Sequence, residues 1–120
     1  MMSKLFLGAA LAVAGALSIA GAAAAQDADG ATIFNRRCNL CHGNAEQAPS
    51  LKGVVGRPIA AIADYGYSDA LKGHKEAWSE SSLDKFLTNT QTFAPGSWMD
   101  FQEADPKVRK AVIDYLKTLK

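Results

Sequence analysis

The chain contains only two cysteines, and both lie in one short run that also contains a histidine. The run reads Cys38-Asn39-Leu40-Cys41-His42, so two residues separate the thiols and an imidazole directly follows the second thiol. One turn of helix presents two side chains at this spacing toward the same side. The run constrains the fold more than any other feature, because whatever these three groups bind must lie beside that turn.

The C-x-x-C-H pattern is the attachment signature of c-type haem. The two thiols add across the two vinyl groups of the macrocycle, which lie on the same side of it. The adjacent imidazole then points at the iron as its proximal ligand. The sequence therefore predicts one haem c, held covalently through Cys38 and Cys41, with His42 as an iron ligand.

Three other uses of Cys38 and Cys41 fit the sequence less well. A structural zinc site needs four ligands, and the chain has no second cysteine pair. The dithiol of a thiol oxidoreductase usually lies in a βαβ pattern, which is absent from this sequence. A disulfide between the two cysteines would not need the adjacent His42. Covalent haem staining of the denatured protein distinguishes these alternatives from haem attachment.

The apolar residues are unevenly distributed along the chain. Residues 1–25 are almost entirely apolar, carry the single charge of Lys4, and end in a run of alanines. A basic start, an uncharged stretch and a small-residue cleavage site are typical of a secretory signal peptide. We therefore expect a signal peptide over 1–25 and one domain over 26–120, exported to the periplasm. An uncleaved stretch over 5–25 would instead tether the same domain to the membrane.

The domain that follows the leader carries no net charge. The chain has 13 lysines and arginines and 12 acidic residues. Lys4 belongs to the leader, so the domain has equal numbers of basic and acidic residues. A nucleic-acid binder is not expected, because neither a basic excess nor a basic run is present. Two cysteines are too few for a disulfide-dense scaffold, and the length suits one small domain.

Helical patterns separated by long loops predict an all-α domain. Helices are expected over 30–37, 68–72, 79–90 and from 106 onwards. Glycine and proline recur between them, so 44–58 and 91–101 are expected to be loops. Three or four short helices make a thin core for so many loops. A bound cofactor is therefore expected to fill the middle of the domain.

The second axial iron ligand has two candidates in the domain. Besides His42, the domain contains one histidine, His74, and one methionine, Met99. Met99 follows a Pro-Gly turn, and a thioether paired with an imidazole is a standard axial ligand set. His74 lies in the charged stretch 72–76 and is expected at the solvated surface. Met99 is therefore predicted as the second ligand.

Beyond the haem motif, several short pieces of the sequence occur together in a familiar order. They are Gly30 to Phe34, Cys38 to His42, Pro49 to Arg57, Tyr67 to Ala70, Trp78, Leu83 to Leu87, Pro95 to Phe101 and Tyr115-Leu116. In order and near-family spacing these pieces resemble the small soluble monohaem cytochromes c of bacteria and mitochondria. The resemblance implies a cytochrome c fold, with three to four helices wrapped around one covalent haem and the terminal helices in contact.

The resemblance also implies roles around the haem. The carbonyl of Pro49 is expected to accept a hydrogen bond from His42 and so to set its tautomer. Arg57, Tyr67 and Trp78 are expected to donate hydrogen bonds to the inner haem propionate, since a buried carboxylate needs such partners. Each residue also has a plainer interpretation: a loop breaker, a surface arginine, a packing tyrosine and a core tryptophan.

Further positions resemble packing residues of the family. Phe86 matches an aromatic near the methionine ligand, and Phe101 matches an aromatic that covers the haem edge. The contact between the first and last helices matches at Gly30, Phe34, Tyr115 and Leu116. There the glycine permits close approach of the two backbones.

The implied function is that of a periplasmic one-electron carrier and not an enzyme, because both axial positions of the iron would be filled. Expected partners are redox proteins, donors and acceptors, that dock weakly at the haem edge of a monomer. Neither nucleic acid nor a membrane span is expected once the leader is cleaved. Two alternatives remain: a dedicated electron-accepting subunit of a periplasmic dehydrogenase, and a peroxidase-like or ligand-sensing haem protein.

The chain departs from the mitochondrial pattern in charge. No lysine lies in the segment 90–98 before Met99, Asp100 follows directly, and Asn89-Thr90 lacks the usual proline. A strongly basic docking face is therefore not expected on this side. An exposed Trp98 would offer an apolar docking contact instead.

Overall fold

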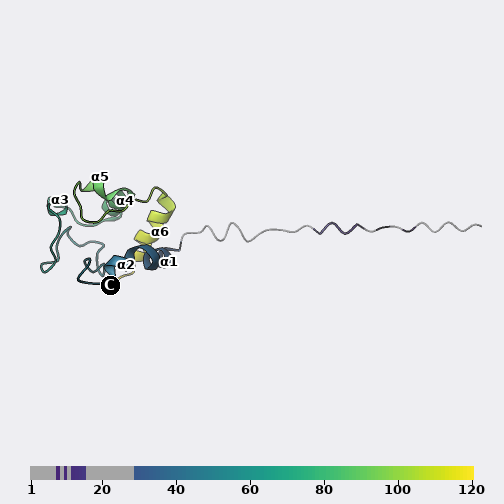
Figure 1. Ribbon diagram of the computed structural model, residues 1–120, viewed down its shortest axis with the longest axis horizontal. Coiled ribbons are helices and arrows are strands. Elements are labelled where there is room, and N and C mark those ends of the chain that lie inside the picture. The colour runs from purple at the N-terminus through teal and green to yellow at the C-terminus, as the bar shows by residue number, and fades with distance from the viewer. Residues whose placement is uncertain (1–7, 9, 11, 16–28) are drawn as a thin grey trace, which may run out of the picture.

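The computed structural model describes residues 8, 10, 12–15 and 29–120, and the helices lie within 29–120 (Figure 1). In chain order they are α1 (Gly30–Ile33), the π-helix η2 (Phe34–Cys38), α2 (Asn39–His42), α3 (Asp69–Lys72), α4 (Glu80–Thr88), α5 (Thr90–Phe93) and α6 (Pro106–Leu116). Among the described residues the only β pairing is an isolated bridge between Pro58 and Ala77. The all-α prediction is confirmed.

The first helical run is longer than the sequence pattern indicated. We expected a helix over 30–37, whereas helical backbone continues without a break from Gly30 to His42. A π-turn over Phe34–Cys38 interrupts its regular spacing, and such turns are frequent at functional sites. Both cysteines and the adjacent histidine therefore lie on this helical run, as expected for thiols presented by one helical turn.

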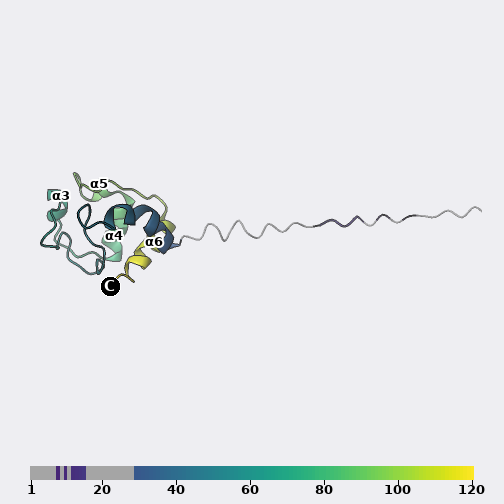
Figure 2. The same cartoon turned by 60° about the horizontal axis from the view of Figure 1, so that its bottom comes forward.

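The last helix, α6, begins as its sequence predicts. The carboxylate of Asp105 accepts a hydrogen bond from the backbone N–H of Lys107 at 2.9 Å, and Pro106 occupies the first helical position. Val112 and Leu116 lie on its buried face. The helix packs against both α1 and α4, as the two views show (Figures 1 and 2).

The expected contact between the first and last helices is present. A Cβ atom on Gly30 would lie 2.1 Å from the backbone oxygen of Ala111, which is far inside contact distance. The rings of Phe34 and Tyr115 meet one turn further along, with centroids 5.1 Å apart. Glycine is required at position 30 because the two backbones approach too closely for any side chain.

The expected helix over 79–90 divides into two. Helix α4 ends at Thr88, because Asn89 is extended and its side chain accepts hydrogen bonds from the backbone N–H groups of Gln91 and Thr92. Asparagine in this role is a common helix N-cap. A short new helix, α5, therefore starts at Thr90, and the prediction of an uninterrupted loop over 91–101 is wrong in its first part.

None of the helices in the described parts of the chain is long and apolar enough to cross a membrane. Most of the expected leader, 1–25, lies outside the described residues. The signal peptide and the boundary at 26 therefore stay predictions.

Candidate functional site

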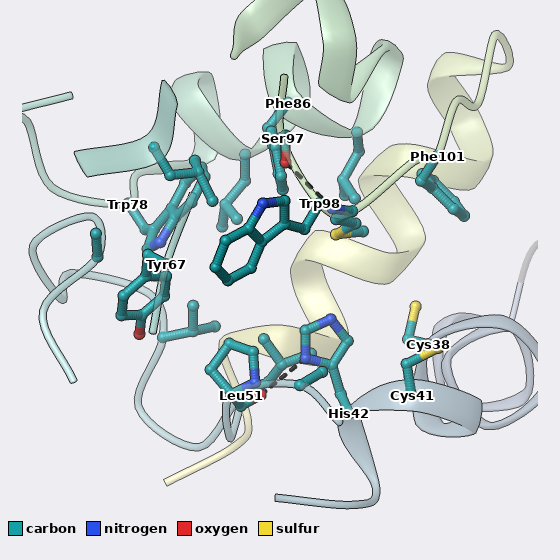
Figure 3. Close-up of a pocket in the computed structure, with 18 of the residues that line it drawn as sticks. Cys38, Cys41, His42, Leu51, Tyr67, Trp78, Phe86, Ser97, Trp98 and Phe101 are labelled. Atoms are coloured by element: carbon teal, nitrogen blue, oxygen red, sulfur yellow. Dashed lines mark hydrogen bonds between the residues drawn. The ribbon is translucent and has the colours of Figure 1, made fainter. Parts of the chain in front are cut away.

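A cavity of about 410 Å³ opens between the first helical run and the segment 97–101 (Figure 3). Every site residue predicted from the sequence lines it: Cys38, Cys41, His42, Pro49, Arg57, Tyr67, Trp78 and Met99. These residues come from segments far apart in the chain, so the fold brings them to one place. Their roles toward a cofactor stay predictions.

Both cysteine thiols lie at the same edge of the cavity (Figure 3). Neither forms a disulfide; Cys38 is half-buried and Cys41 is exposed. Burial raises the pKa of the Cys38 thiol, and the positive charge of Arg37 opposes this rise. The amide of Gln47 lies 3.8 Å from the sulfur of Cys41. Two unpaired thiols one helical turn apart suit attachment to one edge of a flat ligand.

The imidazole of His42 points into the cavity with one nitrogen already engaged (Figure 3). Its Nδ1 lies 2.8 Å from the carbonyl oxygen of Pro49, which can only accept, so Nδ1 carries the proton. Burial lowers the pKa of His42, the hydrogen bond to Pro49 opposes this, and the positive charge of Arg57 lowers it further. The neutral ring leaves the lone pair of Nε2 free to bind a metal.

The segment that carries Met99 forms the opposite wall. Ser97 and Trp98 lie across the cavity from His42 in Figure 3, and Met99, the next residue, lines the same cavity. The Met99 backbone N–H donates to the Ser97 hydroxyl at 3.3 Å. A thioether and an imidazole therefore face one space from two sides.

The three residues expected to bind a propionate also line this cavity. Arg57 donates to the backbone oxygens of Ser50 at 3.0 Å and Lys52 at 3.3 Å, which holds its own loop together. The Tyr67 hydroxyl accepts from the backbone N–H of Ile62 at 3.4 Å, so its proton remains free to donate. Trp78 is buried, with its indole on the cavity wall (Figure 3).

Aliphatic and aromatic side chains supply most of the remaining wall. Helical spacing indicated several of them in advance, while the wall residues that the sequence reasoning missed include Gln47, Ala48, Ala60, Tyr65, Leu71 and Ser97. Most of these lie in irregular segments without a periodic pattern, so no local signal marked them. An apolar wall with thiols at one edge and metal ligands on two sides fits a haem.

The structure corrects the expectation for His74. Its side chain is only 25% exposed, because its ring stacks on Phe93 with centroids 4.2 Å apart and planes 7° from parallel. Its Nε2 lies 2.9 Å from the Phe93 carbonyl oxygen and its Nδ1 lies 3.0 Å from a Glu76 carboxylate oxygen. The residue is absent from the cavity wall and instead joins its own loop to α5.

A model of the Cytochrome c family matches residues 28–120. The chain belongs to the cytochrome c family. It is 36% identical over 96 residues to the cytochrome c of Euglena viridis, which covers 76% of this chain and 94% of the relative. It is 36% identical over 97 residues to cytochrome c2 of Rhodopila globiformis, covering 77% and 92%.

A solved structure agrees with this assignment. Cytochrome cH from Methylobacterium extorquens superposes with a TM-score of 0.66 at 38% identity, covering 75% of this chain and 98% of the other. The predicted resemblance and cytochrome c fold are confirmed. Members of the cytochrome c family are haem proteins that carry electrons, and the cavity of this chain fits such a cofactor.

Proposed function

We propose that this chain is a periplasmic one-electron carrier with a single haem c attached through Cys38 and Cys41 and ligated by His42 and Met99. One observation carries the proposal: these four groups line a single cavity although Met99 is far from the others in sequence. Haem supplies the one-electron chemistry at its iron.

The chain's own residues prepare that cavity. The Pro49 carbonyl holds the proton on Nδ1 of His42 and leaves Nε2 as the ligand atom. Apolar walls exclude water and disfavour additional positive charge, while a soft thioether ligand favours ferrous iron. Both effects raise the reduction potential. Arg57, Tyr67 and Trp78 would bind the inner propionate, with the Tyr67 hydroxyl proton still free for this.

The same geometry favours a carrier over an enzyme. If His42 and Met99 both hold the iron, no coordination position would remain for a substrate. Covalent attachment retains the cofactor through repeated brief encounters with donor and acceptor proteins. Leu40 is exposed by 72% and lies outside the cavity, whereas the indole of Trp98 lines the cavity itself (Figure 3). An exposed apolar side chain such as Leu40 supports weak docking of redox partners that does not depend on a ring of lysines.

Replacing the proposed thioether ligand tests this function. In the haem-loaded protein, Met99→Ala should remove the weak red absorption band of ferric thioether ligation and lower the reduction potential. It should also speed the binding of cyanide, because one axial position opens. Val108→Ala is the matched control, since this half-buried residue of α6 lies off the cavity wall and away from α5, and it should retain the band.

Three results would contradict the proposal. A wild-type protein without the thioether band that binds cyanide rapidly would favour a peroxidase-like or ligand-sensing protein. A Met99→Ala variant with the wild-type spectrum would exclude Met99 as a ligand. Failure of haem to remain with the denatured chain would exclude covalent attachment.

A further inference from the structure

The side-chain amide of Gln91 is bonded along the segment that carries Met99. Its Nε2 donates to the backbone oxygen of Ser97 at 2.8 Å and to that of Met99 at 3.3 Å. Its Oε1 accepts from the backbone N–H of Gly96 at 3.0 Å. A single side chain thus engages three of the four consecutive residues 96–99.

The segment has few other internal bonds. Within it, the Ser97 N–H donates to the Ala94 oxygen at 2.9 Å and the Met99 N–H donates to the Ser97 hydroxyl at 3.3 Å. Beyond it, the backbone N–H of the buried Thr90 donates to the Phe101 carbonyl oxygen, and the Thr90 hydroxyl accepts from the Phe101 N–H. Thr90 therefore holds the chain at Phe101, while Gln91 holds residues 96–99, which include Met99.

Helix α5, which carries Gln91, is itself anchored from two directions. The Asn89 side chain caps its first N–H groups at 3.0 and 3.2 Å. From the preceding loop, His74 stacks on Phe93 and lies 2.9 Å from its carbonyl oxygen. A single helical turn has little stability by itself. The contacts from Asn89 and His74 therefore hold α5, and with it Gln91, in place.

We infer that Gln91 is a positioning residue for the iron ligand Met99. It acts by hydrogen bonding to the backbone of Gly96, whose φ of +92° marks the turn, and to the carbonyl oxygens of Ser97 and Met99 that follow it. Without these bonds the segment would hold the Met99 thioether less firmly against the iron, and an external ligand would replace it more often. The inference rests on the proposed ligation by Met99.

The experiment measures imidazole binding to the ferric, haem-loaded protein by absorption spectroscopy. An imidazole ligand must displace Met99, so its affinity reports how often the thioether is detached. The hydrogen bonds lost in Gln91→Ala should together change the equilibrium between attached and detached Met99 about tenfold. Imidazole should therefore bind about tenfold more tightly to Gln91→Ala than to the wild type. The matched control is Gln102→Ala, which removes only the 3.1 Å bond from Asn89 and should change the affinity less than twofold.

A second variant separates the donor and acceptor atoms of the amide. Gln91→Glu keeps an oxygen that can accept from the Gly96 N–H. It replaces the donor Nε2 by a second carboxylate oxygen, which repels the carbonyl oxygens of Ser97 and Met99. Imidazole affinity should rise at least as much as in Gln91→Ala. Amide exchange of Gly96 should stay slow in Gln91→Glu and become fast in Gln91→Ala, because only the first retains an acceptor.

The outcomes distinguish this inference from the proposed ligation. If the wild type shows the thioether band, Met99→Ala loses it, and both Gln91 variants bind imidazole like the wild type, the positioning role is overturned. A lower unfolding midpoint with unchanged imidazole affinity would likewise reduce Gln91 to a structural residue. If the wild type lacks the band, the proposed ligation fails and the inference falls with it.

Discussion

The imidazole of His42 illustrates how one contact determines the chemistry available to a side chain. Its 2.8 Å contact with the Pro49 oxygen occupies Nδ1, and burial favours the neutral ring. Only Nε2 is then left to face the cavity. At the same scale, the Gln91 amide uses both its donor and its acceptor on the opposite wall. The two faces of the cavity are thus prepared by different kinds of hydrogen bond.

The Glu76 carboxylate gives a pH-dependent prediction at the residue scale. Hydrogen bonds from its own backbone N–H and from His74 lower its pKa below the ordinary value of 4.5. A lowered folded-state pKa adds stability above the unfolded pKa, and that stability is lost as pH falls through the folded value. Glu76→Gln should therefore unfold at slightly lower urea concentration than the wild type at pH 7, and the difference should vanish in strong acid.

Urea midpoints measured across acid pH check this, with the exposed Glu46→Gln as control. Among the described residues the Glu46 side chain forms no ion pair, so its replacement should shift the midpoint less. An equal difference between Glu76→Gln and wild type at pH 3 and pH 7 would show that the charge of Glu76 contributes nothing.

At the scale of elements, the contact between α1 and α6 depends on one missing side chain. Helix α1 has only four residues, so its stability must come from packing and from its continuation into η2. The close approach at Gly30 and the ring contact of Phe34 with Tyr115 supply that packing. Through this continuous run, the α6 contact holds the helical turn that bears Cys38 and Cys41.

Gly30→Ala should therefore destabilise the protein by about 1–3 kcal/mol, the usual cost of overpacking a tight contact. The added Cβ would meet the backbone oxygen of Ala111, which cannot move without shifting α6. Denaturant unfolding of the haem-loaded protein measures this. Gly73→Ala is the matched control, because its added Cβ meets nothing closer than 3.6 Å and its φ of −71° suits alanine. Equal stability of the two variants would contradict a close helix contact.

At the scale of the whole molecule, the cavity is large for so small a domain. Its walls are mostly apolar, so without the proposed cofactor they would face water and contribute little burial to stability. Small domains are stable by only about 5–15 kcal/mol. The domain without its proposed cofactor would therefore have almost no net stability.

The double variant Cys38→Ser with Cys41→Ser should accordingly lose its cooperative thermal unfolding transition, because nothing would hold the haem covalently in the cavity. Circular dichroism against temperature measures this loss. Wild-type protein produced without haem is the control and should behave in the same way. A cooperative transition in either sample would show that the apolar walls close on themselves without the cofactor.

The part of the site that was predictable from sequence is its local part. Cys38, Cys41 and His42 are neighbours in the chain, so their spacing alone indicates their joint chemistry. Resemblance extended the prediction to distant residues such as Arg57 and Trp78, and the fold brings them to the same cavity. The role of these distant residues toward a haem still needs the experiments above.

Two sequence-based expectations differ from the structure. His74 lies in a charged stretch and was predicted to be solvated, yet it stacks on Phe93, 19 residues away. Residues 91–93 of helix α5 were predicted to be loop, because a single turn has too few residues for a helical pattern, although the adjacent Asn89 caps it. The contact of His74 forms only because distant segments pack together, and local composition carries no record of that packing.

The sequence by itself determined the all-α class, the haem motif and the neutral domain charge, because each follows from residue type and short-range spacing. Tertiary structure alone decided that Met99 faces His42 across one cavity, that Gly30 lies against Ala111, and that Gln91 is bonded to the Met99 segment. Those contacts join residues separated along the chain. They form only when burial of apolar side chains compensates for the lost chain entropy.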